Sequence, residues 1–176
     1  MIHDAPIPYP DLDTLSPQLR DAVTSRASLN IFRMITHTPN LAPSFLTMAS
    51  DLLQHNSLPA TWRELCILRV GHRYDATYEV YQHNLIGKAV GLGDGALDAA
   101  KTGSPDHLDD EHAAIMRLTD ALLDDHTLTG ANLAEARNLL TLNQLADLVL
   151  TVGFYQLVCN FLNTFQVMPE NQDAGQ

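Results

Sequence analysis

The chain of 176 residues carries 10 Lys and Arg against 21 Asp and Glu, a formal net charge of −11, and 45% of its residues are hydrophobic. Its length is typical of one domain with a sizeable core, and its composition is globular rather than disordered. The negative charge argues against nucleic acid and anionic lipid as partners, because both require a surface rich in Lys and Arg.

The start of the chain and its most apolar stretch predict neither export nor membrane insertion. The first residues form no basic region, and Pro6, Pro8 and Pro10 interrupt any apolar segment there. Residues 145–165 are the longest apolar stretch, but Asp147 and three amide side chains break it, whereas a membrane span needs about 18 apolar residues. We therefore expect a cytoplasmic protein that does not bind membranes.

Apolar residues recur with a helical period along nearly the whole chain, which predicts an all-α fold. We expect a single-domain antiparallel bundle of roughly seven or eight helices. The expected helical segments lie near residues 17–26, 29–35, 41–55, 62–73, 76–90, 96–101, 110–125, 131–140 and 144–165.

Helix boundaries are predicted from capping residues. Ser16 before a proline is typical of a helix start, and Thr61 followed three residues later by Glu64 has the form of a capping box. Gly91 is expected just after the C-terminus of a helix, and Asn143 is expected to cap the last one.

The last expected helix, 144–165, carries apolar residues around most of its circumference. A helix that is apolar on every side is normally buried on every side. In a chain of this size, that indicates burial at a subunit interface as well as in the core. We therefore expect a homo-oligomer.

The most unusual segment for chemistry is 71–83. Glu79 and His83 are four residues apart, so a helix places them on one face, and that face continues to Ile86 and Val90. The pair is therefore expected to face inward. A carboxylate beside an imidazole in a dry environment fixes the ring's tautomer and makes it an acid or base usable near neutral pH.

Other interpretations of these residues stay open. Glu79 and His83 could form a surface ion pair or a hydrogen-bonded core pair, and Glu64 could either cap its helix or face inward. Together the three side chains are also a possible metal-ligand set, although no further ligand converges on them. Arg73 could hold a substrate carboxylate or be a solvated charge at a helix end.

The other sequence motifs, cysteines and histidines do not indicate a second catalytic or metal site. No G-x-S-x-G nucleophile motif, phosphate-binding glycine loop or zinc-finger spacing is present. Cys66 and Cys159 are not spaced as C-x-x-C and are expected to be small buried residues. His107, His112 and His126 lie among acidic residues and are expected to be solvated.

Several motifs together resemble the carboxymuconolactone decarboxylase family of the alkylhydroperoxidase-D-like superfamily. They are Asn30-Ile31-Phe32 with Pro39-Asn40-Leu41, Arg63-Glu64 leading into Ile67-Leu68-Arg69-Val70, Tyr78-Glu79-x-x-x-His83, Gly87-Lys88-Ala89-Val90-Gly91-Leu92, Val152-Gly153-Phe154-Tyr155 and Asn160-Phe161-Leu162-Asn163. The resemblance covers residues 28–167, which leaves a lead with a short helix at 1–27 and a frayed tail at 168–176. It implies an antiparallel helical bundle that assembles into trimers or hexamers.

The peroxidase branch of that superfamily carries a C-x-x-C pair, a glutamate one helix earlier and a late histidine. The resemblance places the glutamate on Glu64 and the histidine on His83, but the cysteine positions fall on Ala76 and Glu79. Disulfide-based peroxide reduction needs thiols, so the sequence excludes it unless Cys66 acts alone.

Because the glutamate and the histidine are matched and the cysteines are not, the resemblance implies a proton relay without a redox centre. It implies a cofactor-free decarboxylase, or a related proton-transfer lyase or isomerase, for a small cyclic or aromatic-pathway carboxylic acid or lactone. His83 is expected to be the acid/base, Glu79 and Glu64 its orienting groups, and Tyr78 the donor to the enolate oxygen, while Arg73 binds the substrate carboxylate. No metal or cofactor is expected.

Two other classes of function stay open. One is a thiol-dependent, peroxidase-like redox protein that uses Cys66. The other is a non-catalytic helical oligomer that binds a ligand.

Overall fold

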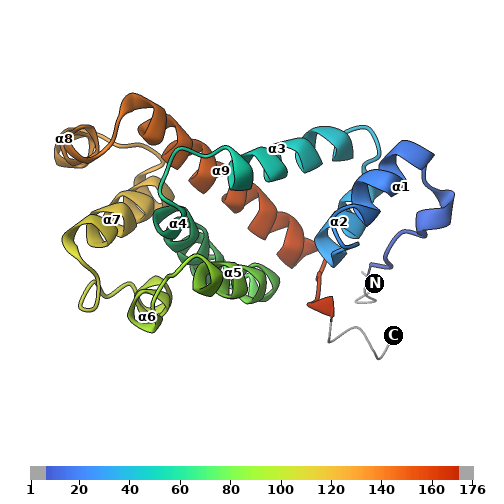
Figure 1. Cartoon of the computed structure of the whole chain (residues 1–176), viewed down its shortest axis with the longest axis horizontal. Helices are drawn as coiled ribbons and strands as arrows, with labels where there is room; N and C mark the ends of the chain where they lie inside the picture. Colours follow the sequence, from blue (N-terminus) through green and yellow to red (C-terminus); the bar gives the residue numbers. More distant parts are fainter. Residues whose placement is uncertain (1–6, 171–176) are drawn as a thin grey trace, which may run out of the picture. The chain divides into compact units, whose positions relative to one another are not determined.

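The computed structural model describes residues 7–170, which form nine α-helices and two short 3-10 helices with no strand among them (Figure 1). The all-α prediction is confirmed, and the nine α-helices of the described residues slightly exceed the seven or eight expected. The parts of the predicted lead and tail at residues 1–6 and 171–176 lie outside the described residues. In chain order the elements are η1 (Leu12–Thr14), α1 (Pro17–Thr24), α2 (Asn30–Met34), η2 (Ile35–His37), α3 (Ala42–Gln54), α4 (Ala60–Arg73), α5 (Thr77–Ala89), α6 (Asp94–Thr102), α7 (Asp110–Asp125), α8 (Gly130–Leu139) and α9 (Leu142–Thr164).

Contacts among the described residues group them into two compact units, residues 7–55 with 161–170 and residues 56–160. The first unit holds η1 to α3 and the end of α9, and its core includes Leu19, Ile35 and Leu46. Arg26, just after α1, donates hydrogen bonds from its guanidinium to the Ser50 hydroxyl and the Leu46 carbonyl of α3. α1 and α3 are thereby joined through polar as well as apolar contacts.

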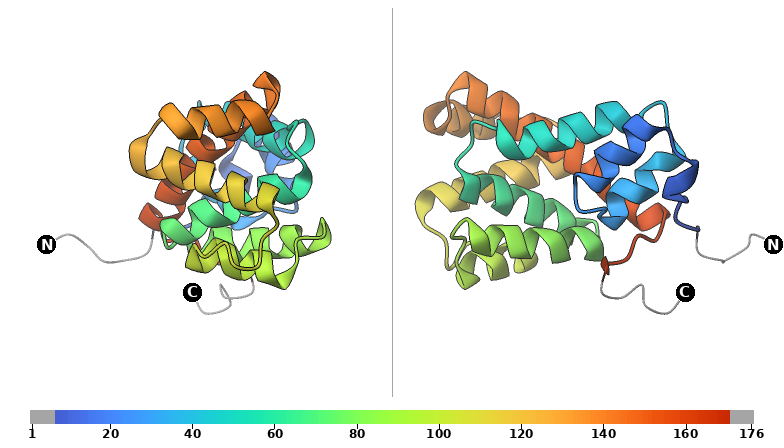
Figure 2. Two further views of the ribbon diagram at one scale, coloured as in Figure 1. Left: turned by 90° about the vertical axis from the view of Figure 1, so that its left-hand side faces the viewer. Right: turned by 45° about the vertical axis from the view of Figure 1, so that its right-hand side comes forward.

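The second unit is built around α4, which contacts α5, α6 and α7 (Figures 1 and 2). Ten consecutive residues of α4, from Trp62 to Gly71, are buried. Leu65 and Leu68 pack with Ala99 of α6 and Met116 of α7 in the core of this unit. Because α4 is enclosed, each of its charged side chains needs a partner inside the protein.

Two predicted helix boundaries are confirmed. The Ser16 side chain caps α1 by accepting a hydrogen bond from the backbone N–H of Leu19. Gly91 follows α5 with a φ of +96°, a left-handed conformation that a residue with a Cβ adopts at a cost.

Two other predicted caps are wrong. α4 begins at Ala60, so Thr61 lies inside the helix and Glu64 does not form a capping box with it. α9 begins at Leu142, so Asn143 is also inside its helix. The cap of α9 is Thr141, whose hydroxyl accepts from the N–H of Gln144 at 3.2 Å while the Gln144 side-chain oxygen accepts from the N–H of Thr141 at 3.0 Å.

This capping box predicts a contrast between two neighbouring exposed residues. Thr141→Ala removes the acceptor for a first-turn amide and is expected to lower the free energy of unfolding by about 1 kcal/mol. Asn143→Ala, the matched control, is expected to change it by less than about 0.5 kcal/mol. Urea denaturation followed by circular dichroism measures both, and equal losses in the two variants would contradict the assignment.

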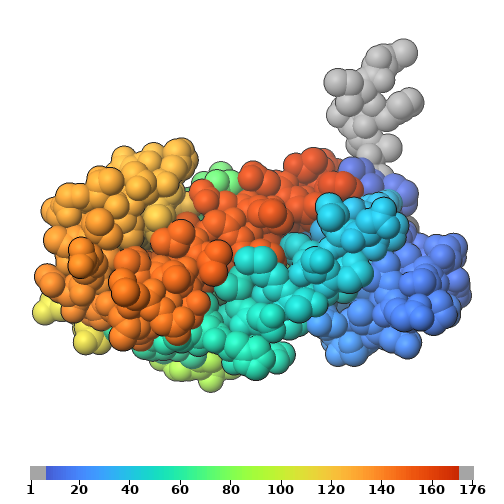
Figure 3. All heavy atoms as spheres, turned by 90° about the horizontal axis from the view of Figure 1, so that it is seen from above, coloured from blue at the N-terminus to red at the C-terminus, as the bar shows by residue number. Residues whose placement is uncertain are grey.

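α9 leaves one apolar face exposed. Leu142 is 78% exposed, and Val149, Leu150 and Leu157 lie along the same face. Figure 3 shows the first half of α9 (dark orange) at the surface beside α8 (light orange). The sequence predicted that α9 is buried partly in the core and partly at a subunit interface. A single chain leaves this face open, and its coverage by another subunit stays a prediction.

α9 is also the one described helix whose length and composition would allow it to cross a membrane. It has 23 residues and a mean hydropathy of 1.6 over its most apolar window of 18 residues. A helix that contributes to a protein core meets the same criterion, and 44% of that window is buried within the chain. Length and hydropathy alone therefore give only weak evidence for a membrane span.

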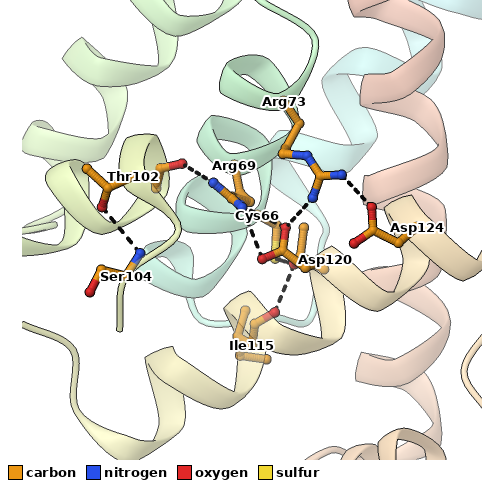
Figure 4. A network of polar contacts seen from close by, with 10 residues as sticks. Cys66, Arg69, Arg73, Thr102, Ser104, Ile115, Asp120 and Asp124 are labelled. Carbon is orange, nitrogen blue, oxygen red and sulfur yellow. Dashed lines mark hydrogen bonds and ion pairs between the residues drawn. The ribbon is translucent and has the colours of Figure 1, made fainter. Parts of the chain in front are cut away.

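Ion pairs join α4 to α7, and a hydrogen bond joins α4 to α6 (Figure 4). Arg69 makes two hydrogen bonds to the carboxylate of Asp120, at 2.8 and 3.2 Å, and a third to the carbonyl of Ala100 at 3.2 Å. Gly103 lies against this guanidinium with a φ of +80°, and a Cβ there would come within 2.8 Å of Nη2 of Arg69. The buried arginine therefore holds the C-terminal end of α6 against α4.

Candidate active site

Three of the side chains singled out in the sequence meet in the second unit. Nδ1 of His83 lies 2.6 Å from Oε2 of Glu64, and Nε2 of His83 lies 3.0 Å from Oε1 of Glu79. Glu79 and His83 are one turn apart on α5, and Glu64 reaches them from α4. All three are at most 5% exposed, so the prediction that they face inward is confirmed.

Arg63 extends this cluster by a fourth charged group. Its Nε donates a hydrogen bond to Oε1 of Glu64 at 3.0 Å, and its side chain is only 10% exposed. The buried groups therefore alternate in sign: guanidinium, carboxylate, imidazole, carboxylate. The cluster is electrically neutral only when the ring of His83 is protonated on both nitrogens.

The His83 ring is held in this protonated form. Burial alone lowers its pKa, but the nearby carboxylates of Glu79 and Glu64 outweigh burial and raise the pKa to about 9. At neutral pH the ring is therefore an imidazolium, which can give up a proton. The sequence indicated an acid or a base, and the geometry favours the acid.

The two carboxylates do not hold the ring in the same way. Glu64 accepts a short hydrogen bond from the ring and another from Arg63. Oε1 of Glu79 is buried and has no hydrogen-bond partner in the described part of the chain, so its contact with His83 is an ion pair without hydrogen-bond alignment. Glu64 therefore fixes the ring, whereas Glu79 has a carboxylate oxygen left to accept a proton or a ligand's hydrogen bond.

Tyr155 of α9 is the neighbour that the sequence analysis missed as a site residue. Its ring meets that of His83 edge to face, with centroids 5.2 Å apart and an angle of 84° between the planes. Burial, reinforced by the charges of Glu79 and Glu64, raises the pKa of Tyr155 well above its usual value, so its hydroxyl stays a donor at neutral pH. The only signal was its place in the Val152–Tyr155 motif, which carries no spacing relation to His83.

Tyr78 and Arg73 leave their helices in other directions than the three clustered side chains. Tyr78 lies five residues before His83, about 140° around α5. Arg73 lies nine residues after Glu64, about 180° around α4, and pairs with Asp120 at 3.0 Å and with Asp124 (Figure 4). The guanidinium of Arg73 is thus engaged on the opposite side of α4.

Both cysteines are buried, as predicted. Cys66 is fully enclosed, and burial raises the pKa of its thiol to about 12 even though the Thr119 hydroxyl donates a hydrogen bond to its sulfur. Burial and the charge of Glu79 also raise the pKa of Cys159. Both thiols are therefore protonated and unreactive at neutral pH.

Among the described residues, no side chains have the geometry needed for the metal site that the sequence left open. No group of three or more His, Cys, Asp or Glu side chains within the described residues is arranged to hold a metal ion. Both ring nitrogens of His83 already face carboxylates, so the ring could ligate a metal only by giving up one of these partners.

His112 departs from the expectation that it is solvated. Its side chain is 20% exposed, and its two ring nitrogens contact Asp109 and Thr61. Trp62 meets the ring edge-on at 6.4 Å.

No protein-family model matches the chain, and no curated protein matches it either. Solved structures do match. An alkylhydroperoxidase AhpD core, an uncharacterized peroxidase-related protein from Ralstonia eutropha JMP134, has a TM-score of 0.84 at 17% identity and covers 94% of this chain and 92% of its own. The fold is that of the alkylhydroperoxidase-D core.

Two further structures share this AhpD-like fold. An uncharacterized peroxidase-related protein from Silicibacter sp. TM1040 has a TM-score of 0.74 at 15% identity and covers 100% of this chain and 99% of its own. The debrominase Bmp8, a cysteine-to-alanine variant in complex with 2,3,4-tribromopyrrole, has a TM-score of 0.75 at 13% identity and covers 96% and 93%. At such identities the AhpD-like fold is shared, and the chemistry has to be argued from the side chains.

The raised pKa of His83 predicts how stability depends on pH. The ring has a pKa of about 9 in the folded chain and about 6.5 when unfolded. Its contribution, of the order of 3 kcal/mol, is fully present below about pH 6.5 and is lost as the pH rises through 9. Urea unfolding of the wild type and of His83→Gln between pH 6 and 10 checks this.

The difference in free energy of unfolding between wild type and His83→Gln should shrink toward high pH. Ring nitrogen chemical shifts give the pKa directly, and Glu79→Gln should lower it by at least about one unit. Parallel stability curves, or a ring that titrates near pH 6.5, would contradict the ion pairs described above.

Proposed function

We propose that the protein is a cofactor-free decarboxylase, or a related proton-transfer lyase or isomerase, for a small cyclic or aromatic-pathway carboxylic acid or lactone. The observation that supports it is the imidazolium of His83 held between two buried carboxylates. A protonated ring in a dry environment can act as the general acid that returns a proton to carbon.

In the proposed reaction the substrate loses CO₂ and gains a proton at the same carbon. The bond between carbon and the substrate carboxylate breaks, CO₂ leaves, and its electron pair moves through the adjacent unsaturation to the carbonyl oxygen as an enolate. His83 then gives its proton to the carbon, and the neutral ring regains a proton from water. Such proton donation contributes about 10²–10⁴-fold to a rate.

The neighbours of His83 have separate roles in this proposal. Glu64, itself held by Arg63, orients the ring and stabilises its charge, and Glu79 stabilises the same charge from the other nitrogen. The Tyr155 hydroxyl replaces Tyr78 as the proposed donor to the enolate oxygen, because its ring lies against His83. Arg73 is left out of substrate binding because its guanidinium is paired with Asp120 and Asp124.

A thiol-dependent peroxidase is the second candidate, since two of the similar structures are described as peroxidase-related. Peroxide reduction starts from a thiolate. The Cys66 thiol has a pKa of about 12 and is fully buried, which argues against this chemistry.

Turnover of a panel of β-keto acids and unsaturated lactone acids in D₂O tests the decarboxylase proposal. The wild type is expected to release CO₂ and place one deuterium on the carbon that loses it. His83→Gln is expected to lower kcat by about 10²–10⁴-fold because the proton donor is gone. Cys66→Ala, the matched control at another buried position nearby in sequence, is expected to keep kcat within about threefold.

Three outcomes would count against a decarboxylase. Hydroperoxide turnover lost in Cys66→Ala would support the peroxidase instead. A His83→Gln variant that only unfolds at lower temperature, with unchanged kcat, would make the cluster structural. No turnover in the wild type across the panel, together with ligand binding, would favour the non-catalytic oligomer.

We also propose that the protein is a cytoplasmic homo-oligomer, a trimer or hexamer, whose subunits meet through α9. The argument is the row of exposed apolar residues Leu142, Val149, Leu150 and Leu157 on one face of that helix. A second copy of the chain offers the same apolar face and can bury it.

Leu150→Glu tests this assembly. A charge in the middle of the α9 face is expected to convert the oligomer into smaller species in light-scattering measurements. Leu85→Glu, at a leucine of α5 that is 56% exposed, is the control and is expected to leave the mass unchanged. A monomeric wild type, or equal dissociation in both variants, would contradict the proposal.

A further inference from the structure

A second cluster with catalytic geometry lies in the second unit, on α4 and α7. Nδ1 of His112 is 2.9 Å from both carboxylate oxygens of Asp109, and Nε2 of His112 is 3.1 Å from the hydroxyl oxygen of Thr61. Thr61 belongs to the first turn of α4, while Asp109 and His112 are the N-cap and the first turn of α7. A hydroxyl, an imidazole and a carboxylate therefore stand in a row.

The chemistry of the partners fixes the direction of the hydrogen bonds. An ionised carboxylate only accepts, so Nδ1 of His112 carries the proton that faces Asp109. Nε2 of the neutral ring is then the acceptor for the Thr61 hydroxyl. This is the arrangement of a nucleophile, a base and a group that orients the base, at distances within hydrogen-bond reach.

Helix capping accounts for only part of this geometry. To cap α7, Asp109 needs one oxygen on the backbone N–H of His112, a bond that is present at 2.8 Å. The cap does not require the second ring nitrogen to meet Thr61 on a different helix. Trp62 packs against the ring at a right angle, and the His112 side chain stays 20% exposed, so the ring is held in place without being sealed from solvent.

A cavity of about 270 Å³ lies beside these groups, and Thr61, Asp109 and His112 all line it. Gly93 and Gly95, at the start of α6, line it as well, and a glycine has only backbone atoms to present. The first turn of a helix has amide N–H groups without helical partners, which suit an oxyanion. The cavity is smaller than the roughly 300–1,000 Å³ of sites for drug-sized ligands, so it fits a short acyl group.

We propose that this cavity is a second catalytic site, which hydrolyses small esters with Thr61 as the nucleophile. His112 takes the Thr61 proton as the hydroxyl oxygen attacks the acyl carbon, and it gives that proton to the departing alcohol. Water then attacks the acyl-threonine while His112 takes its proton and returns it to the Thr61 oxygen as the acid leaves. The overall reaction is ester plus water to acid plus alcohol.

Hydrolysis of p-nitrophenyl acetate by the full chain tests the proposal. Thr61→Val is expected to lower kcat by at least about a hundredfold, whereas Thr61→Ser keeps the hydroxyl and most of the rate. Asp109→Ser keeps a helix-capping hydroxyl but loses the carboxylate, so it should fold normally and lower kcat. Mass spectrometry of the quenched reaction should find the acetyl group on Thr61.

Two controls separate this site from unspecific hydrolysis and from the site at His83. His55 has a side chain that is 73% exposed and does not line this cavity, so His55→Gln should keep the rate. His83→Gln should keep it as well, whatever its effect on decarboxylation. Full activity in Thr61→Val, acetylation elsewhere than Thr61, or no turnover and no acetylation in the wild type would each overturn the proposal.

Discussion

The structure of the second unit depends on one electrostatic constraint, namely that the charges enclosed between α4 and α5 must cancel. Glu64 is completely buried, and a buried carboxylate without partners is strongly destabilising. Arg63 supplies one positive charge and protonated His83 supplies the second, so that two carboxylates face two cations. The proton on His83 is therefore part of what holds α5 against α4, and the same proton is the one that the proposed reaction uses.

The central position of α4 explains how one helix supports several separate polar sites. Glu64 faces α5, whereas Arg69 lies about 140° around the helix and pairs with Asp120 of α7. Thr61, in the first turn, meets His112 of α7. Because each side chain leaves the helix in its own direction, the polar contacts that fix α6 and α7 stay apart from the groups that carry a transferable proton.

The sequence predicts the local parts of this arrangement better than the tertiary ones. Glu79 and His83 share a helix face, so their spacing alone places them together. Tyr155 contacts His83 from a position more than seventy residues later in the chain, and no spacing in the sequence predicts that contact. His112 was expected to be solvated because its sequence neighbours are acidic, yet Trp62 and Thr61 cover it from α4. Hydropathy likewise identified α9 as the most apolar helix, but the enclosed helix is α4. Its buried charged residues lower its mean hydropathy, so its burial is not evident from the sequence.

The carboxylates around His83 also bear on which chemistry suits the site. Burial, and after it the charge of Glu64, raises the pKa of Cys66, and burial together with the charges of Glu79 and Glu64 raises the pKa of Tyr155. The surroundings therefore disfavour a thiolate or a phenolate, while the two carboxylates favour an imidazolium. A peroxidase needs the anion that this environment opposes. A decarboxylase needs the opposite: a substrate carboxylate that is poorly stabilised before CO₂ leaves, and an acid and a neutral hydroxyl ready for the enolate that forms. The same buried surroundings thus disfavour the first reaction and support the second.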